Sequence, residues 1–488
     1  MPEGFVTGGQ GNFFVQTEAA DPFDLLTCTG VGDLPLPKGD LTPEYCPDPE
    51  HSGEFIIDGK IRGEPAAATT TLERPLSTVY NWLLEQTCSF NALVAWMCGG
   101  VRAVTTNFKV AAVLFGVESS NSTILAPVAR QPGDDGRVLT NADITYDDRR
   151  MIYPIAFLTQ TLANTADANG IAFLPAACES ACGPARGLCE IGFMGLDGTQ
   201  YNSEVKYTLD GGATWAQTAT DPFLYDGGDT GKPLLIELAD GAYRVIVPRI
   251  SVAVGEYAEI AYSDDGGATW TNVYVGTVAG QFITKLFMYQ GTIWATASGG
   301  YIYVCEDIGV TWTAQEAGVE TVQTLRDVVM YSSLVGYAVG DTNAFLYTVN
   351  GGTDWALRIG PAVLTNLRSV AVNFTDYVFV GAADGTLYYT VDRGENWLTR
   401  RAFGAGSVDW VAFDKTRRYF GGLIHNTGAP VGTAYRSFDG GASWETPTGQ
   451  TATWNSGLND GWICDQNNFY VVGNTHGGLT FVAKASPS

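Results

Sequence analysis

Six short motifs between residues 208 and 444 carry the residues that could do chemistry. Each motif has eight residues, with an acid or amide at its third position and tryptophan at its eighth. We call them boxes one to six; they hold Asp210 and Trp215, Asp265 and Trp270, Asp307 and Trp312, Asn350 and Trp355, Asp392 and Trp397, and Asp439 and Trp444. Paired carboxylates can act as the acid and nucleophile of glycoside hydrolysis. Regular repetition instead favours a structural role.

The residue types of a box suit a tight turn. Asp or Asn can accept hydrogen bonds from nearby backbone amides, and Gly can adopt the positive φ that such a turn needs. A Ser or Thr hydroxyl adds a weaker local hydrogen bond. The tryptophan then buries a large ring against neighbouring structure. We therefore expect the box acids to stabilise turns and to have no catalytic role.

The elements around the boxes are predicted to be short strands. An alternating run precedes each box, as in residues 345–349 and 386–391, and further strand-like runs lie upstream at 367–372 and 377–381. Each unit thus reads as four antiparallel strands, which is one blade of a β-propeller. Successive box tryptophans are 42–55 residues apart, a period typical of propellers. Seven blades closed by pairing the two ends fit best, with six as the alternative.

The boxes resemble the Asp-box (bacterial neuraminidase) repeat of sialidases and photosystem II assembly factors. The resemblance covers residues 188–488, and it implies a propeller in which the box joins the third and fourth strands of a blade. Boxes three to five depart from the pattern. Cys305 replaces the first hydroxyl, Asn350 replaces the acid, and Asp354 and Asn396 replace the second hydroxyl.

The resemblance does not extend to a sialidase active site. The Arg-Ile-Pro or Arg-Leu-Pro motif that accompanies sialidase boxes is absent, and Pro248-Arg249-Ile250 only echoes it. No arginine cluster for a substrate carboxylate is evident beside a nucleophile and an acid. We therefore assign no catalytic residue and expect that the protein is not an enzyme.

The first third of the chain differs from the rest. Residues 1–175 contain no box and no period, and we expect a β-rich domain with one helix at Ser77–Gln86, where Ser77 is a candidate N-cap. A linker rich in Cys, Gly and Pro follows at 176–187, and the propeller is expected over 188–488. The predicted fold class is all-β dominated.

Charge and hydropathy exclude several classes of protein. The 488 residues carry a formal net charge of −25, which argues against a basic patch for the nucleic-acid backbone. Residues 1–20 lack the basic start and apolar core of a secretory signal. The most apolar stretch, Asn91–Val117, is interrupted by Arg102 and Lys109, so it does not qualify as a membrane span.

Nine cysteines do not assemble into a recognisable metal site. Cys178, Cys182 and Cys189 have a loop-like spacing, but a fourth ligand is not evident and the chain has three histidines. We predict no metal and no cofactor. If the protein matures outside the cell, disulfides are an option; the candidate pairs are Cys28 with Cys46 and Cys178 with Cys189. Buried free thiols are the alternative for the cysteines in strands.

The N-terminal domain carries a second, fainter resemblance. Residues 62–65, 69–76, 82–85 and 98–100 look like parts of uncharacterised bacteriophage virion proteins, in which a tail tube domain carries an Asp-box propeller. This resemblance implies homo-oligomeric stacked rings, with the propeller outside and DNA passing through the lumen without sequence-specific binding. It also implies other virion proteins as partners and a place in the virion, after assembly in the host cytoplasm.

Three classes of function remain in order of preference. The first is a structural virion protein, a subunit of a phage tail tube. The second is a binding module whose propeller grips a glycan or a protein, for example on the host surface. The third is a sialidase-like glycoside hydrolase, which the missing arginine motif disfavours.

Overall fold

The computed structural model divides the chain into two compact units, Met1–Pro154 and Ile155–Pro487. Each unit is described by itself. The structure describes residues 9–15, 24–31, 38–47, 55–64, 66–73, 90–97, 108–119, 139–146, 148–152, 155–162, 166–174, 191–198, 203–223, 229–238, 242–250, 256–315, 321–361, 365–374, 376–414, 419–427, 431–447, 457–463, 465, 468–476 and 479–487.

The first unit is built on a sheet of seven described strands in the order β6-β1-β2-β5-β8-β7-β9. Their bounds are β1 Gly9–Val15, β2 Asp24–Val31, β5 Ala66–Glu73, β6 Phe90–Met97, β7 Phe108–Ser119, β8 Leu139–Tyr146 and β9 Asp148–Ile152. Because β6 pairs with β7 as well as with β1, six of these strands close into a ring. Strand β7 pairs with β6 on one side and with β8 and β9 on the other.

Two further strands of this unit form a separate two-stranded sheet. Strand β3 (Lys38–Pro47) pairs antiparallel with β4 (Phe55–Glu64), and among the described strands neither pairs with the seven-stranded sheet. The helix expected at Ser77–Gln86 lies outside the described residues. In the rest of the described chain, the helical structure is a single 3-10 turn, η4 (Ser298–Gly300).

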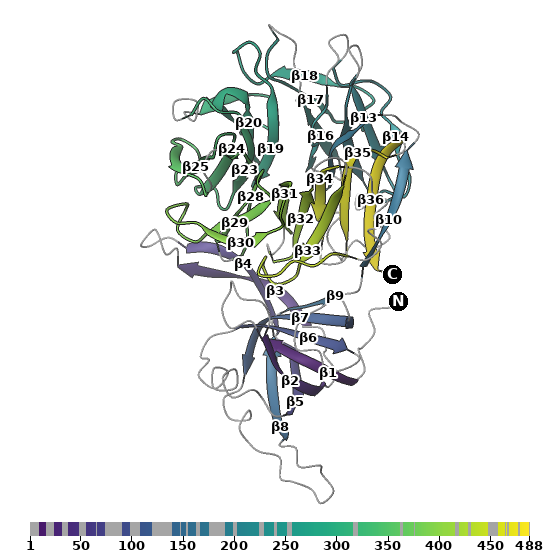
Figure 1. Cartoon of the computed structure of the whole chain (residues 1–488), viewed down its shortest axis with the longest axis vertical. Coiled ribbons are helices and arrows are strands. Elements are labelled where there is room, and N and C mark those ends of the chain that lie inside the picture. The colour runs from purple at the N-terminus through teal and green to yellow at the C-terminus, as the bar shows by residue number, and fades with distance from the viewer. Residues whose placement is uncertain are drawn as a thin grey trace, which may run out of the picture. The chain divides into compact units, whose positions relative to one another are not determined.

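The second unit is a seven-bladed β-propeller, as the repeat predicted (Figure 1). The inner strands of blades one to seven are β11 Ala168–Phe173, β15 Leu234–Glu237, β19 Ile283–Tyr289, β23 Leu325–Met330, β27 Leu367–Val372, β31 Ser407–Phe413 and β34 Leu458–Ile463. The second strands are β12 Gly192–Leu196, β16 Tyr243–Pro248, β20 Thr292–Ala297, β24 Gly336–Gly340, β28 Val378–Ala382, β32 Gly421–Asn426 and β35 Phe469–His476.

The third strands are β13 Glu204–Thr208, β17 Glu259–Ser263, β21 Ile302–Cys305, β25 Ala344–Thr348, β29 Thr386–Thr390, β33 Gly432–Ser437 and β36 Leu479–Pro487. The outer strands of blades one to five are β14 Ala216–Gln217, β18 Thr271–Tyr274, β22 Thr313–Gln315, β26 Ala356–Ile359 and β30 Leu398–Ala402. In blade six a bridge between Arg436 and Glu445 stands in the place of the outer strand.

Blade seven closes the ring by combining the two ends of the unit. Its outer strand is β10 (Ile155–Leu162), which pairs antiparallel with β36 from Ile155↔Pro487 to Leu162↔Thr480. We expected the propeller to begin at residue 188, but β10 and β11 belong to its blades. These two strands have eight and six residues and no box beside them, so their sequence did not indicate that they belong to a blade.

This closure explains why seven blades hold six boxes. Each box lies at the turn from the third to the outer strand of its blade, as box one does between β13 and β14. In blade seven those two strands come from opposite ends of the unit, so no such turn exists there.

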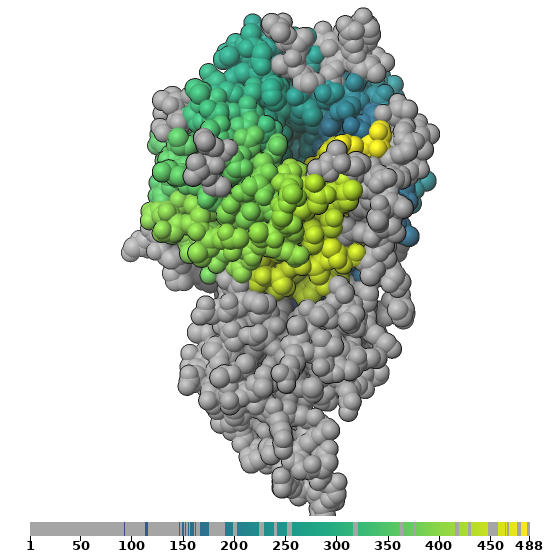
Figure 2. All heavy atoms as spheres, viewed as in Figure 1, coloured from purple at the N-terminus to yellow at the C-terminus, as the bar shows by residue number. Residues whose placement is uncertain are grey.

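The hydrophobic core lies between the blades. One cluster joins blades seven, one and two through side chains that include Val472, Phe193 and Val245, and another joins blades four and five through Val339 and Val370. In Figure 2 the coloured blades follow one another around the ring from blue through green to yellow. No helix among the described residues is long and apolar enough to cross a membrane.

Candidate functional site

The boxes share one hydrogen-bond network, seen clearly in box two. The Ser263 hydroxyl donates to Oδ1 of Asp265 at 2.8 Å and accepts from the amide of Gly267 at 2.8 Å. Asp265 in turn accepts from the amide of Thr269 at 2.9 Å and from its hydroxyl at 2.6 Å. These hydrogen bonds hold the pKa of Asp265 down, to about 2, with the Thr269 hydroxyl as the largest contribution. The side chain is exposed and its oxygens are engaged within the turn.

The boxes that depart from the pattern keep the same network with other atoms. In box three the Cys305 thiol stands 3.0 Å from Asp307 and accepts from the amide of Gly309. In box four one side-chain hydrogen bond runs in the opposite direction, because Asn350 donates from its Nδ2 to the Asp354 carboxylate at 2.8 Å. The degenerate boxes are therefore chemically equivalent turns.

The box backbone takes two consecutive positive φ values. In box two these are 74° at Gly266 and 86° at Gly267. In box three Ile308 occupies the first of these positions with φ 54°, and in box five Arg393 does so with φ 58°. Left-handed backbone at these non-glycine residues shows that the surrounding hydrogen bonds dictate the turn.

Three box tryptophans bind the preceding blade through the indole N–H. Trp270 donates to the carbonyl of Thr220, Trp355 to Gln315, and Trp397 to the carbonyl of Ile359. The indoles of boxes three and six donate to carbonyls of their own turns; these residues are Trp312 and Trp444. Burial differs among them, and the Trp270 ring is half-buried whereas Trp355 is 2% exposed.

The box acids do not converge on one site. Because the boxes lie at the outer turns of six different blades, their carboxylates are distributed around the ring. The structure instead brings polar side chains together on the propeller axis, at residues that the sequence did not single out.

A repeated β-bulge builds this axial site. In six blades the pairing of the inner strand with the second strand skips one residue near the start of the inner strand. The skipped residues all line one cavity of about 550 Å³; they are Asn169, Thr284, Arg326, Arg368, Asp409 and Asn459. A bulge leaves its extra residue unpaired and redirects the side chain. The recurrence of the bulge therefore sets a ring of polar side chains around the cavity, which we call the bulge ring.

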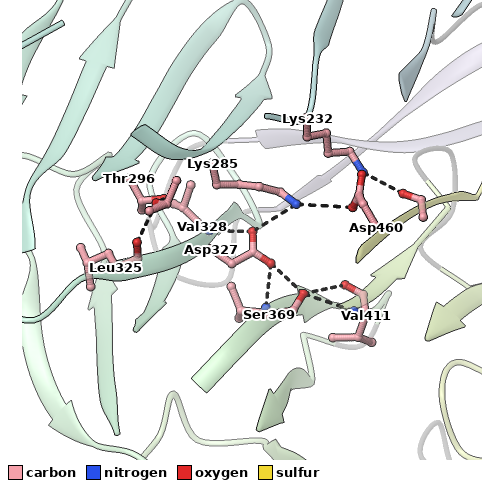
Figure 3. Close-up of polar contacts among 12 residues, drawn as sticks. Lys232, Lys285, Thr296, Leu325, Asp327, Val328, Ser369, Val411 and Asp460 are labelled. Carbon is pink, nitrogen blue, oxygen red and sulfur yellow. Dashed lines mark hydrogen bonds and ion pairs between the residues drawn. The ribbon is translucent and has the colours of Figure 1, made fainter. Parts of the chain in front are cut away.

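Four charged side chains from four blades meet in the cavity beneath the bulge ring (Figure 3). Lys232 donates to Asp460 at 3.0 Å and to the carbonyl of Gly461 at 2.7 Å. Lys285 lies between two carboxylates, with its Nζ 4.0 Å from Asp327 and 3.9 Å from Asp460. These side chains join blades on opposite sides of the axis.

Both carboxylates are also bound by backbone amides of neighbouring blades. Asp460 accepts from the amide of Ile171 in blade one at 3.1 Å. Asp327 accepts from the amide of Val370 and the hydroxyl of Ser369 in blade five, at 3.0 and 2.7 Å, and from the amide of Val328 at 3.0 Å. The carboxylate oxygens of Asp327 and Asp460 thus already accept hydrogen bonds from the protein.

The two lysines differ in electrostatics. Burial lowers the pKa of Lys232 to about 8, although the Asp460 carboxylate opposes this effect. Burial also disfavours the charge of Lys285, but the carboxylates of Asp327 and Asp460 outweigh it and raise the pKa. Lys285 is therefore a charged donor at neutral pH.

The sequence held one signal for this site. Lys285, Asp327, Ser369 and Val411 follow one another at intervals of 42 residues. Lys285, Asp327 and Ser369 occupy equivalent places next to the bulge on successive inner strands. In the following blade Trp410 holds that place, and Val411 lies one residue further on. Because the residue types differ from blade to blade, the interval is visible only once the blades are aligned.

The side chains of the candidate disulfide and metal cysteines do not belong to the part of the chain that the structure describes. Cys178, Cys182 and Cys189 fall outside the described residues, and so do the side chains of Cys28 and Cys46. Cys305 is a buried free thiol in box three. Among the described residues no group of His, Cys, Asp and Glu side chains could hold a metal ion. Arg249 is buried in an ion pair with Glu256 at 2.8 Å.

Comparisons with known proteins give only structural likenesses. No family model and no curated protein matches the sequence. Solved structures that resemble the chain include YCF48 bound to D1 peptide, with 16% identity and a TM-score of 0.49 over 68% of this chain and 96% of the other. YCF48 from Cyanidioschyzon merolae has 16% identity and a TM-score of 0.47 over 68% and 99%. The GH74 xyloglucanase from Xanthomonas campestris has 13% identity and a TM-score of 0.46 over 66% and 52%.

Proposed function

We propose that this chain is a structural protein that assembles through its N-terminal unit and presents the propeller as a binding head. The resemblance of the N-terminal sequence to phage virion proteins makes a tail tube subunit the specific form of this proposal. In that form the subunits stack as rings around a DNA conduit. The net charge of −25 suits such a lumen, because it repels the phosphate backbone.

The β3–β4 hairpin is the observation that carries the assembly proposal. A two-stranded sheet is marginally stable on its own, and its outer edges present unpaired backbone groups. Within the described residues this hairpin stands apart from the closed ring of strands. Pairing with another copy of the chain supplies the missing hydrogen bonds. Head-to-tail contacts of this kind give closed rings or open filaments.

Deleting the hairpin tests assembly in the full chain. We expect the native chain to form rings or tubes by negative-stain microscopy. A variant in which residues 38–64 are replaced by a short Gly-Ser linker should be monomeric by light scattering, with the same propeller melting transition. A control variant keeps both strands and replaces only residues 48–54 with a Gly-Ser linker, and it should still assemble. Assembly of the deletion variant, or a monomeric native chain at high concentration, contradicts the proposal.

A non-catalytic propeller is part of the same proposal. In the axial cavity, the carboxylates of Asp327 and Asp460 are bound by backbone amides and lysines. These contacts suit a structural role in which the two side chains hold neighbouring blades together. A glycosidase needs one carboxyl group free to deliver a proton. Incubation with a panel of oligosaccharides should therefore give no reducing-end product above a heat-denatured control.

The alternative function is a binding module for a glycan or a protein, without assembly. The observation that favours it is the axial cavity with its bulge ring. The same microscopy separates the two functions, because isolated single particles support the binding module alone.

A further inference from the structure

The axial cavity contains hydrogen-bond donors that have no acceptor among the described residues. Asp327 and Asp460 accept several hydrogen bonds, whereas two cationic donors make none. Lys285 makes no hydrogen bond to any residue that the structure describes, since its Nζ is 4.0 Å from Asp327 and 3.9 Å from Asp460, beyond hydrogen-bond distance. Nε of Arg368 is buried without a hydrogen-bond partner in the described chain, 3.8 Å from Asp409. A buried donor without a partner costs free energy, so a ligand that supplies acceptors is favoured.

The carboxylates of the cavity attract these donors as ion pairs without forming hydrogen bonds to them, and Arg368 faces Oδ1 of Asp409 in this way. Oδ2 of Asp409 already accepts from Ser407 and from Asn426, each at 2.6 Å. Arg326 is engaged by Asp341 through two hydrogen bonds of 2.5 and 2.8 Å. The two residues that carry these donors, Lys285 and Arg368, line the cavity from blades three and five, on either side of blade four.

The opposite side of the bulge ring offers acceptors. Nδ2 of Asn169 donates to Asp197 and to the carbonyl of Thr230, and Nδ2 of Asn459 donates to the carbonyl of Ala168 and to Asn474. With both amide hydrogens of each group used, the amide oxygens of Asn169 and Asn459 are left to accept from a ligand. These two residues belong to blades one and seven.

The charge of the ligand follows from the lining. Four cationic residues line the cavity with three acidic ones, Asp327, Asp409 and Asp460. A dianion such as phosphate meets repulsion from three carboxylates, whereas a singly charged carboxylate meets less repulsion and can be held by Lys285 and Arg368 together. A carboxylate is also the group that Arg and Lys bind through strong charge-assisted hydrogen bonds.

We propose that the axial cavity binds a small hydroxylated carboxylate, as a free sugar acid or as the terminal sugar acid of a glycan. Lys285 and Arg368 hold the carboxylate, and the amide oxygens of Asn169 and Asn459 accept from hydroxyl groups at the other end. A cavity of about 550 Å³ is in the usual range for small-molecule sites. This inference rests on the binding role proposed for the propeller and is independent of assembly.

Calorimetry on the full chain tests the ligand class. The probes are D-glucuronate, D-glucose as its neutral counterpart, and an oligosaccharide ending in glucuronate. We expect saturable binding of glucuronate and none of glucose; tighter binding of the oligosaccharide identifies a glycan as the source. A peptide with a free C-terminal carboxylate serves as a further arm. If the peptide binds while both sugar acids do not, or if no carboxylate binds at millimolar concentration, the proposal is wrong.

Variants assign the binding to this cavity. Arg368→Gln should weaken glucuronate binding about tenfold to a hundredfold, the usual effect of losing one charge-assisted hydrogen bond. Its side chain is 34% exposed, so the fold should survive, and Lys285→Gln offers a second variant with melting monitored. The matched control is Arg358→Gln, since Arg358 lies on an outer strand and pairs with Glu395. Equal binding by the Arg368 and Arg358 variants overturns the assignment. Failure of assembly with binding intact concerns only the proposed structural role.

Discussion

At the scale of single residues, the box acids have a measurable electrostatic signature. The pKa of Asp265 is lowered to about 2 by its hydrogen bonds to Thr269 and Ser263, below the ordinary value of 3.8. A carboxyl group with a lowered pKa in the folded state contributes stability above its unfolded pKa, and this contribution is lost as the pH falls through the folded value. The window for Asp265 is therefore about pH 4 to pH 2.

Replacing Asp265 with Ala should lower the free energy of unfolding by about 0.5–2 kcal/mol at pH 7, as for other side chains that cap backbone amides. The difference from the native chain should shrink when denaturant melts are repeated between pH 4 and pH 2. Asp265→Asn is the control, because Asn350 already closes box four with an amide. It should retain most of the stability and lack the pH-dependent part. A difference for the Ala variant that is equal at pH 7 and pH 2.5 would contradict a charged cap.

Burial ranks the box tryptophans, and two of them form a matched pair. The indoles of Trp270 and Trp355 each donate one hydrogen bond to the preceding blade, but Trp355 is 2% exposed and Trp270 is half-buried. Trp355→Ala should therefore cost about 3–5 kcal/mol. Trp270→Ala should cost clearly less, measured by the same denaturant melts. Equal losses would show that the hydrogen bond, and not ring burial, dominates.

The box residues were predictable and the axial residues were not, for a physical reason. A box is a local turn, so its Asp, Gly and Trp types are dictated by contacts within eight residues. The axial cluster depends on contacts between blades, such as that from Asp460 to the amide of Ile171. Several kinds of polar side chain can make such a contact, and the axial residue types vary around the ring.

At the scale of elements, the strands beside a box were well predicted, and the two propeller strands that precede the first box were misplaced. Strand β29 coincides with the alternating run expected before box five. Strands β10 and β11 precede the first box and so fell on the wrong side of the expected boundary at 175–188. Their place in the ring is set by partners about 300 residues away, as Thr480 shows by donating to the carbonyl of Ala166.

At the scale of the whole molecule, closure of the propeller depends on the segment that links its two ends. The β10–β36 pairing and the contacts of β11 hold blades seven and one together. Asp460 strengthens this contact between blades seven and one, which we call the seam, because it binds both the amide of Ile171 and the ammonium group of Lys232. A propeller without this segment exposes the edge of β36 and the core that β11 covers.

A pair of truncated chains tests the closure. A chain that begins at residue 155 should be monomeric and should melt in one cooperative transition, because it retains every strand of the seven blades. A chain that begins at residue 188 lacks β10 and β11, and it should aggregate or melt without a cooperative transition. A synthetic peptide of residues 155–174 should restore cooperative melting to the shorter chain, since it supplies both missing strands. Equal melting of the two chains by circular dichroism would mean that the ring closes without its N-terminal strands.

The cause of any loss is then isolated by Asp460→Ala in the longer chain, which leaves the β10–β36 pairing in place and removes the ion pair of Lys232. Breaking a buried ion pair in this way typically costs about 3–5 kcal/mol, so a loss of that size places the seam's strength in the axial charges, and a smaller one places it in the strand pairing.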